Sequence, residues 1–351
     1  MRKGWQPVRS PASRLLLGSV ALALCVACSA PGRADSPASR VYVSNEMDGT
    51  VSVVDPIALR VVATISVGKR PRGIRASLDG RTVFVALSGS PMGGPGIDDS
   101  KLPPPERQHD GIGVIDVHSG RLVRVLNGGT DPEQFAIAAD GNRMFVANED
   151  AGQVTVLDIH TGEILKTIDV GGEPEGVDLA PGGRFVYATS EADNQVFVID
   201  TERLQVVHVI NVGPRPRSTA FLPDGSRALV SAENEPAVYT IDTATHGILK
   251  KTELDAGLKP MGLIASPDSR YVYVTTGRGG TLLRIDAASC TVTGSLPVGE
   301  RPWGVGISPD GRMVVTANGP SNDISIVDTG NWTVTGRVRV GERPWGAVFL
   351  R

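Results

Sequence analysis

Arginine flanks proline in several glycine-containing segments of the chain, and tryptophan follows the proline in two of them. A guanidinium group offers a planar set of donors that matches carboxylates and phosphates, and Arg and Trp are enriched among residues that dominate binding energy. These segments predict a site for an anionic ligand or a protein partner. The expected contact residues, with one further arginine from a neighbouring segment, are Arg70, Arg72, Arg215, Arg217, Arg278, Arg301, Trp303, Arg343 and Trp345.

Oxygen-bearing side chains at the ends of expected strands suggest a second chemistry. Carboxylate and amide oxygens hold cations, and a cation polarises a carbonyl group for attack by water. The alternative function is therefore a metal-assisted, lactonase-type hydrolase with an axial cation, although asparagine at a strand end also commonly completes a turn. The residues available for such a cation are Glu46, Asn148, Glu149, Glu191, Glu233 and Asn234.

Other catalytic chemistry has little support in the sequence. None of the five histidines stands in a pattern that pairs a nucleophile with a base. The chain has no Cys-x-x-Cys-His segment and no Cys/His cluster, which argues against c-type haem and a thiolate zinc site. We therefore favour a non-enzymatic binding or scaffold protein without a cofactor.

The elements that must position these residues follow from two repeated markers. A proline three positions after a glycine and an aspartate that ends a β-branched run each recur seven times, mostly 42 residues apart. A period of this length is typical of propellers, in which each unit is a four-stranded sheet. We expect an all-β, seven-bladed propeller of antiparallel blades over residues 40–351. The recurring prolines are Pro71, Pro132, Pro174, Pro216, Pro260, Pro302 and Pro344.

The phase of the repeats predicts how the ring closes. The first unit begins at Val41, in the position of a second strand, whereas the last segment, 346–351, matches the innermost strand of the other units. Pairing of this C-terminal strand with the three N-terminal strands would complete one blade and leave no open edge.

One unit is longer than the others by a Pro/Gly-rich insertion at about residues 88–110. The spacing of its flanking strands places it between the second and third strands of that unit. Long loops on compact scaffolds are usually functional or disordered, and three consecutive prolines, Pro103 to Pro105, stiffen its second half. Its acidic residues and His109 match no defined calcium loop.

Because the strands of a blade alternate in direction, the loops before the inner strands and the loops between the second and third strands emerge on one face. The first set contains the Gly-x-x-Pro segments, and the second set contains the insertion. Charges there are sorted by unit, with Asp131, Glu133, Glu173 and Glu175 acidic and the arginines basic. We expect a polarised rim around the channel mouth. Two simpler interpretations stay open, namely that the loops are only solvated and that the two tryptophans are wedges between blades.

The Val41-Tyr42-Val43-Ser44-Asn45 run and the Val-Gly-x-Arg-Pro-x-Gly runs that begin at Val67, Val298 and Val340 carry a family likeness. They resemble YVTN-type β-propeller repeats, and most of all the exported propellers associated with PQQ-dependent alcohol catabolism. The resemblance implies a periplasmic or envelope protein accessory to PQQ-linked oxidation. Bound PQQ is not expected, because the tryptophan that follows the quinoprotein pattern is missing after Asp158 to Gly162.

The N-terminus predicts export. Basic residues precede a short apolar stretch that begins at Leu15, which is typical of a signal peptide. Two processing routes stay open: a lipoprotein signal over 1–27 with lipidated Cys28, or a signal over 1–34 cleaved after Ala34. The formal net charge of −3 becomes −8 or −7 without this segment. Such a chain lacks the basic footprint of nucleic-acid binders, and we expect a monomer without a transmembrane domain, in the periplasm or attached to the envelope.

Overall fold

The computed structural model describes residues 40–93 and 101–350, together with Met1 and Gly4. Residues 39–351 form one compact unit. The predicted export signal and the lipidation candidate Cys28 lie outside the described residues. No helix in the described ranges is both long and apolar enough to cross a membrane.

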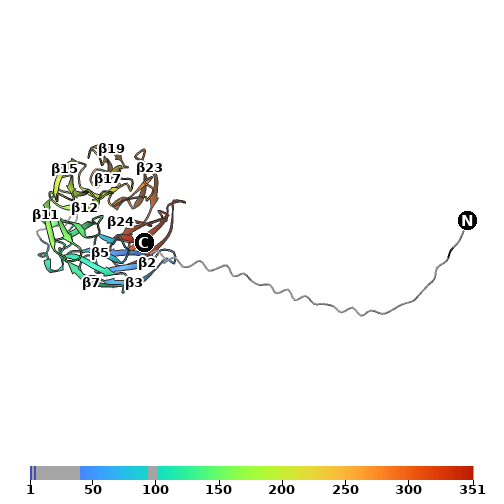
Figure 1. Ribbon diagram of the computed structural model, residues 1–351, viewed down its shortest axis with the longest axis horizontal. Helices are drawn as coiled ribbons and strands as arrows, with labels where there is room; N and C mark the ends of the chain where they lie inside the picture. Colours follow the sequence, from blue (N-terminus) through green and yellow to red (C-terminus); the bar gives the residue numbers. More distant parts are fainter. Residues whose placement is uncertain (2–3, 5–39, 94–100, 351) are drawn as a thin grey trace. The chain divides into compact units, whose positions relative to one another are not determined.

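The unit is a seven-bladed β-propeller, as predicted (Figure 1). Each blade is a four-stranded antiparallel sheet, named below from the inner strand outward. Blade 1 is β28 (Pro344–Phe349), β1 (Val41–Asn45), β2 (Thr50–Asp55) and β3 (Arg60–Ser66); blade 2 is β4 (Ile74–Ala76), β5 (Thr82–Leu87), β6 (Gly111–Asp116) and β7 (Arg121–Leu126); blade 3 is β8 (Pro132–Ile137), β9 (Arg143–Asn148), β10 (Gln153–Asp158) and β11 (Ile164–Asp169). Blade 4 is β12 (Pro174–Leu179), β13 (Phe185–Ser190), β14 (Gln195–Asp200) and β15 (Gln205–Asn211); blade 5 is β16 (Pro216–Phe221), β17 (Arg227–Ala232), β18 (Ala237–Asp242) and β19 (Ile248–Glu253). Blade 6 is β20 (Leu263–Ala265), β21 (Tyr271–Thr275), β22 (Thr281–Asp286) and β23 (Thr291–Pro297); blade 7 is β24 (Pro302–Ile307), β25 (Met313–Asn318), β26 (Asp323–Asp328) and β27 (Thr333–Arg339). The described residues also include three short 3-10 helices in loops: η2 (Arg107–His109), η3 (Glu149–Ala151) and η4 (Gly277–Gly279).

The ring closes as expected from the phase of the repeats. Strand β28 pairs antiparallel with β1, with Val41 opposite Phe349 and Ser44 opposite Gly346. In Figure 1 the C-terminal strand accordingly lies beside the N-terminal strands. The insertion occupies the predicted place, between β5 and β6 of blade 2.

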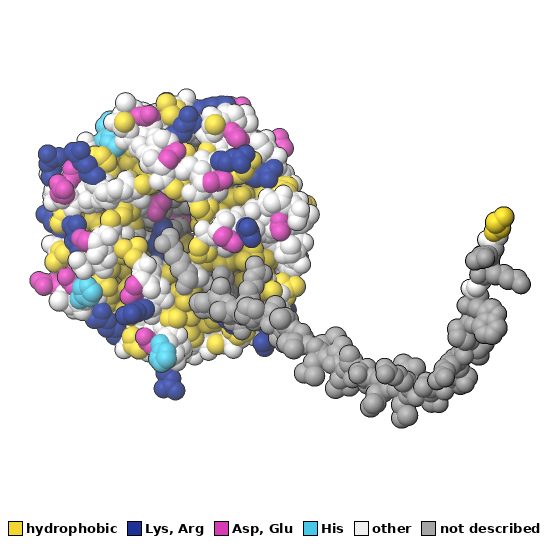
Figure 2. Space-filling model, turned by 45° about the vertical axis from the view of Figure 1, so that its right-hand side comes forward, with side chains coloured by type: hydrophobic (Ala, Val, Ile, Leu, Met, Phe, Trp, Pro, Cys, Tyr) yellow, Lys and Arg dark blue, Asp and Glu magenta, His cyan; other side chains and the backbone are white. Residues whose placement is uncertain are grey.

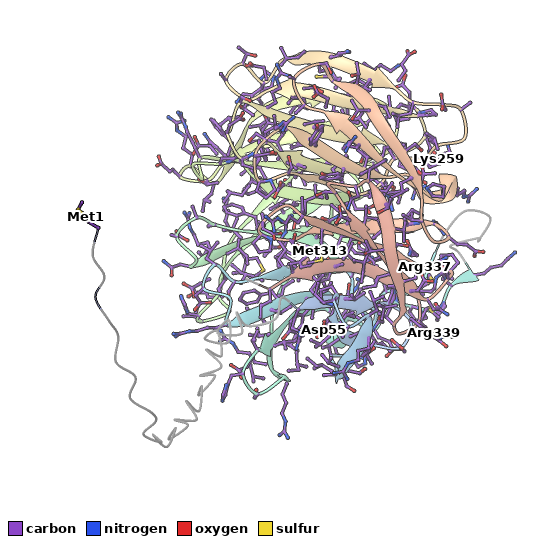
Figure 3. The ribbon with its side chains drawn as sticks, turned by 90° about the vertical axis from the view of Figure 1, so that its right-hand side faces the viewer. Met1, Asp55, Lys259, Met313, Arg337 and Arg339 are labelled. Atoms are coloured by element: carbon purple, nitrogen blue, oxygen red, sulfur yellow. The ribbon has the colours of Figure 1, made fainter. Side chains whose placement is uncertain are left out.

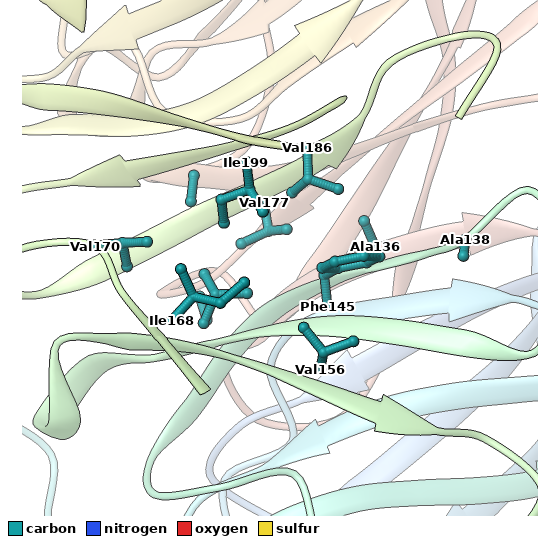
Figure 4. Packing of buried hydrophobic residues seen from close by; sticks show 12 residues of the cluster. Ala136, Ala138, Phe145, Val156, Ile168, Val170, Val177, Val186 and Ile199 are labelled. Carbon is teal, nitrogen blue, oxygen red and sulfur yellow. The ribbon is translucent and has the colours of Figure 1, made fainter. Parts of the chain in front are cut away.

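The hydrophobic core consists of the faces that neighbouring blades present to one another. Between blades 3 and 4, for example, Phe145, Val156, Val177, Val186 and Ile199 pack in one buried cluster (Figure 4). The two middle strands of a blade are buried on both faces, whereas outer strands such as β11 are largely exposed. Because the middle strands of each blade are buried in this packing, we expect the binding residues to lie on the loops.

Neighbouring inner strands approach each other to backbone contact near their first residues. A Cβ atom at Gly304 would lie 2.4 Å from the carbonyl oxygen of Trp345, and one at Gly73 would lie 2.5 Å from that of Glu133. Glycine is required at this distance because any side chain would collide with backbone. The contact fixes the positions of the preceding residues, Arg72 and Trp303, at the head of the central channel.

Candidate functional site

The loops before the inner strands and the loops between second and third strands open into one central cavity of about 1320 Å³. Its lining includes Arg70 and Arg343 from the first set of loops and Glu46 and Glu149 from the second. The prediction that both sets share a face is therefore confirmed. Described residues of the insertion, including Met92, also line the cavity.

The residue before the proline adopts a left-handed backbone in six of the seven loops. This is unusual, because proline normally restricts the preceding residue to extended backbone and non-glycine residues seldom have positive φ. The backbone is held by a repeated hydrogen bond: the amides of Glu149 and Glu191 donate to the carbonyl oxygens of Asp131 and Glu173, each at 3.1 Å. The six residues are Arg70 (φ 40°), Asp131 (52°), Glu173 (51°), Arg215 (60°), Arg301 (46°) and Arg343 (52°).

The residue after the proline forms a second ring, at the start of the inner strands. Its members come from equivalent positions but differ in chemistry from one blade to the next. In the order of blades 1 to 7 they are Trp345, Arg72, Glu133, Glu175, Arg217, Met261 and Trp303. All but Met261 line the cavity.

Arg72 is neutralised by the neighbouring blade 3. Its side chain is almost completely buried and forms ion pairs with the carboxylates of Asp131 and Glu133, and a longer one of 3.4 Å with Glu149. Ser88 donates a further hydrogen bond to Asp131. Three carboxylates therefore surround one guanidinium group, which leaves Arg72 no free face for a ligand.

Three more of the expected arginines are paired in the same way. Arg217, also buried, contacts Glu175 at 2.5 Å and Glu191, and Arg215 lies 2.6 Å from Glu191 and 3.3 Å from Glu233. Arg70 contacts Glu46 at 2.9 Å and donates to the carbonyl oxygens of Ser90 and Pro91 in the insertion. These pairs join adjacent blades and tie the insertion to the rim.

Arg278, Arg301 and Arg343 differ from the other arginines of the site, because none of them forms an ion pair with a described carboxylate. Burial lowers the pKa of Arg301, and the nearby charges of Arg343 and Arg278 lower it further, while Glu233 opposes the shift. Arg301 and Arg343 line the cavity, and Arg343 donates a hydrogen bond to the sulfur of Met92. The unpaired positive charge of the described rim is thus concentrated on blades 6, 7 and 1.

The two tryptophans lie beside this charge. Their ring centroids are 6.2 Å apart with an interplanar angle of 32°. The guanidinium carbon of Arg301 lies 4.7 Å from the centroid of the Trp303 ring and that of Arg217 lies 5.1 Å from it, which is the range of cation–π contacts. Trp303 remains partly exposed to the cavity, whereas Trp345 is buried.

The residues considered for a cation are mostly engaged elsewhere. Glu46, Glu191 and Glu233 pair with arginines. Asn148 is buried, donates to the carbonyl oxygen of Gly128 and accepts from Thr155, as expected for a residue that completes a turn. Asn234 is exposed at the cavity rim. In residues 40–93 and 101–350 no three His, Cys, Asp or Glu side chains are grouped to hold a metal ion.

Glu149 is a titratable group of the cavity whose pKa is strongly raised. Desolvation raises its pKa to about 7, and the charges of Asp131 and Glu175 add to the rise while Arg72 opposes it. Ionisation of Glu149 thus disfavours the folded state. Between its ordinary pKa near 4.5 and pH 7 the unfolded chain binds fewer protons at this site, so this group makes stability fall as pH rises.

We expect the Glu149→Gln variant to be more stable than the wild type at pH 8 and to lose this advantage at pH 5, because only the ionised carboxylate is disfavoured. Urea denaturation at both pH values measures the difference. Glu163→Gln, at an exposed glutamate of blade 3, serves as the matched control and should show no such dependence. An advantage of equal size at both pH values would contradict the assignment.

A family model described as YNCE-like β-propeller matches residues 106–227. This match supports a β-propeller repeat family. No match was found among curated proteins.

Solved structures are similar in fold. Hydrazine synthase of Kuenenia stuttgartiensis has a TM-score of 0.66 at 20% identity, over 79% of this chain and 88% of that chain. A candidate 6-phosphogluconolactonase of Bacteroides fragilis NCTC 9343 has a TM-score of 0.73 at 18% identity, over 91% and 100%. Another from Bacteroides uniformis ATCC 8492 has 0.70 at 17%, over 89% and 99%. Identities this low establish the propeller fold alone.

Proposed function

We propose that this protein is a non-enzymatic binding propeller whose central cavity takes a small anionic ligand at Arg301 and Arg343. One observation carries the proposal: of the six arginines that line the cavity, these are the two without a described carboxylate partner. A charge left unpaired in a partly desolvated cavity favours a ligand of opposite sign. Arg70, Arg72, Arg215 and Arg217 shape the rim, and Arg278 adds to the positive potential.

The setting we propose is the one that the N-terminal signal and the resemblance imply, an exported protein accessory to PQQ-linked oxidation in the periplasm or on the envelope. A protein partner could present the same anionic group. The cavity, however, is lined by the insertion as well as the rim, and a concave site of this kind is typical of small-molecule binding.

The lactonase alternative has less support. Structural similarity to candidate 6-phosphogluconolactonases is a likeness of fold at 18% and 17% identity, and the carboxylates of the axial site are largely paired with arginine. Lactone hydrolysis by the purified protein that requires a divalent metal and is lost in Glu149→Gln would reverse this preference.

The binding proposal predicts that Arg301→Gln weakens the affinity for citrate, succinate or inorganic phosphate about 10-fold to 100-fold, the value of one hydrogen bond to a charged group. Isothermal titration calorimetry at low salt measures it. Arg339→Gln, which removes the same charge from the outer strand β27, is the control and should bind like the wild type (Figure 3). The proposal fails if none of these anions binds or if Arg301→Gln binds them as well as the wild type.

A further inference from the structure

The cavity carries opposite charges on opposite walls. In a closed ring of seven blades, blade 7 faces the junction between blades 3 and 4. Arg301 and Trp303 therefore lie across the channel from Glu149, Glu173 and Glu175. Figure 2 shows acidic and basic side chains interspersed over the face of the molecule that it presents.

Carboxylates exceed cations on the wall made by blades 3 and 4. Asp131, Glu133 and Glu149 share the single guanidinium group of Arg72. Glu173 is exposed at the rim, lines the cavity and forms no ion pair with a described residue. No lysine is among the described residues that line the cavity. The described protein therefore supplies too little positive charge to neutralise this wall.

Glu149 is placed to contact a ligand directly. Its carboxylate lies at the longest of the three distances from Arg72, 3.4 Å, and its side chain is 34% exposed, whereas those of Asp131 and Glu133 are 4% and 7% exposed. Desolvation and the charges of Asp131 and Glu175 raise the pKa of Glu149, and Arg72 offsets only part of this penalty on the ionised carboxylate. An ammonium group in the cavity beside Glu149 would relieve it, because an opposite charge within a few ångströms favours the ionised carboxylate.

We propose that the ligand is dipolar, with an acidic group bound at Arg301 and Arg343 and a primary ammonium group bound at Glu149 and Glu173. This inference rests on the proposed anion binding and specifies its ligand class. The partly exposed Trp303, which lies beside Arg301, offers an apolar surface for the segment that links the two groups. The protein would then bind anions that lack an ammonium group less tightly, because such anions leave the carboxylates of blades 3 and 4 unpaired.

A series of ω-amino acids with four to twelve carbons tests this class and measures the separation of the two poles. Calorimetric affinities are compared with those of the matched alkanoates and N-acetylated ω-amino acids, which keep the carboxylate but lack the ammonium group. We expect at least one chain length to bind about tenfold or more tightly than both matched compounds, since a hydrogen bond to a charged group contributes this much.

Variants separate this inference from the function on which it rests. In Glu149→Gln the affinity for the preferred ω-amino acid should fall to that of its alkanoate, whereas Glu163→Gln should keep the preference. If the alkanoates bind as tightly as the ω-amino acids, or the preference survives in Glu149→Gln, the dipolar ligand is wrong and anion binding stands. If neither series binds, nor any simple anion, both proposals fall.

Discussion

Replacing Arg72 with methionine is expected to lower the free energy of unfolding by about 3–5 kcal/mol, the usual cost of removing one partner from a buried ion pair. The side chain is 2% exposed and contacts two carboxylates that are themselves almost fully buried. Without the guanidinium group, Asp131 and Glu133 would remain desolvated and repel each other. Urea denaturation at pH 7.5 measures the loss, which should shrink at pH 5 as the orphaned carboxylates take up protons.

Arg337→Met is the matched control. Arg337 pairs with Asp323 at 2.7 Å, but its side chain is 46% exposed on the outer strand β27 (Figure 3). An exposed pair of this kind contributes about 0–1 kcal/mol. Equal losses in the two variants would show that the pairs of Arg72 do not hold blades 2 and 3 together.

Removal of residues 342–351 is expected to destabilise the protein by about 5 kcal/mol or more, enough to unfold a chain of ordinary stability. The deletion takes away β28, in which the residues Trp345 and Phe349 are 7% and 5% exposed. Burial of each large apolar side chain contributes about 1.5–3 kcal/mol, and the loss of the strand also exposes an edge of β1. Thermal unfolding followed by circular dichroism measures the change.

A synthetic peptide of residues 342–350 should rebind to the truncated chain and raise its melting temperature, because the vacant edge accepts a strand in the native register. The control is the same peptide with Trp345→Asp and Phe349→Asp, which keeps the backbone donors and loses the buried side chains. A truncated chain as stable as the full one would mean that closure by β28 contributes little.

The architecture was predictable because its markers repeat. Pro71 and its six counterparts, together with the aspartates that end the third strands, recur independently, so their agreement defined seven blades. The closure by β28 and the position of the insertion followed from the phase of the same markers, and the structure confirms both. Periodicity of this kind reports on packing, which every blade shares.

The pairing within the site was harder to predict, because it depends on contacts between blades. The sequence predicted basic and acidic groups at the rim, but it did not show that Arg72 and Arg217 reach into the neighbouring acidic blades. One signal was available: in the order of the repeats, Arg72 and Arg217 flank the two acidic units. The left-handed backbone of residues such as Arg301 had no signal, because arginine and glutamate do not favour it.

The left-handed backbone before the proline is the same whichever residue occupies that position. Six blades hold Arg, Asp or Glu at this position with φ between 40° and 60°. The turn therefore accepts either sign of charge, and each of these six blades holds one charged residue at a fixed place around the channel. A redesign of the charge pattern for a new ligand can therefore keep this backbone, provided that residues paired across blades, such as Asp131 and Arg72, are changed together.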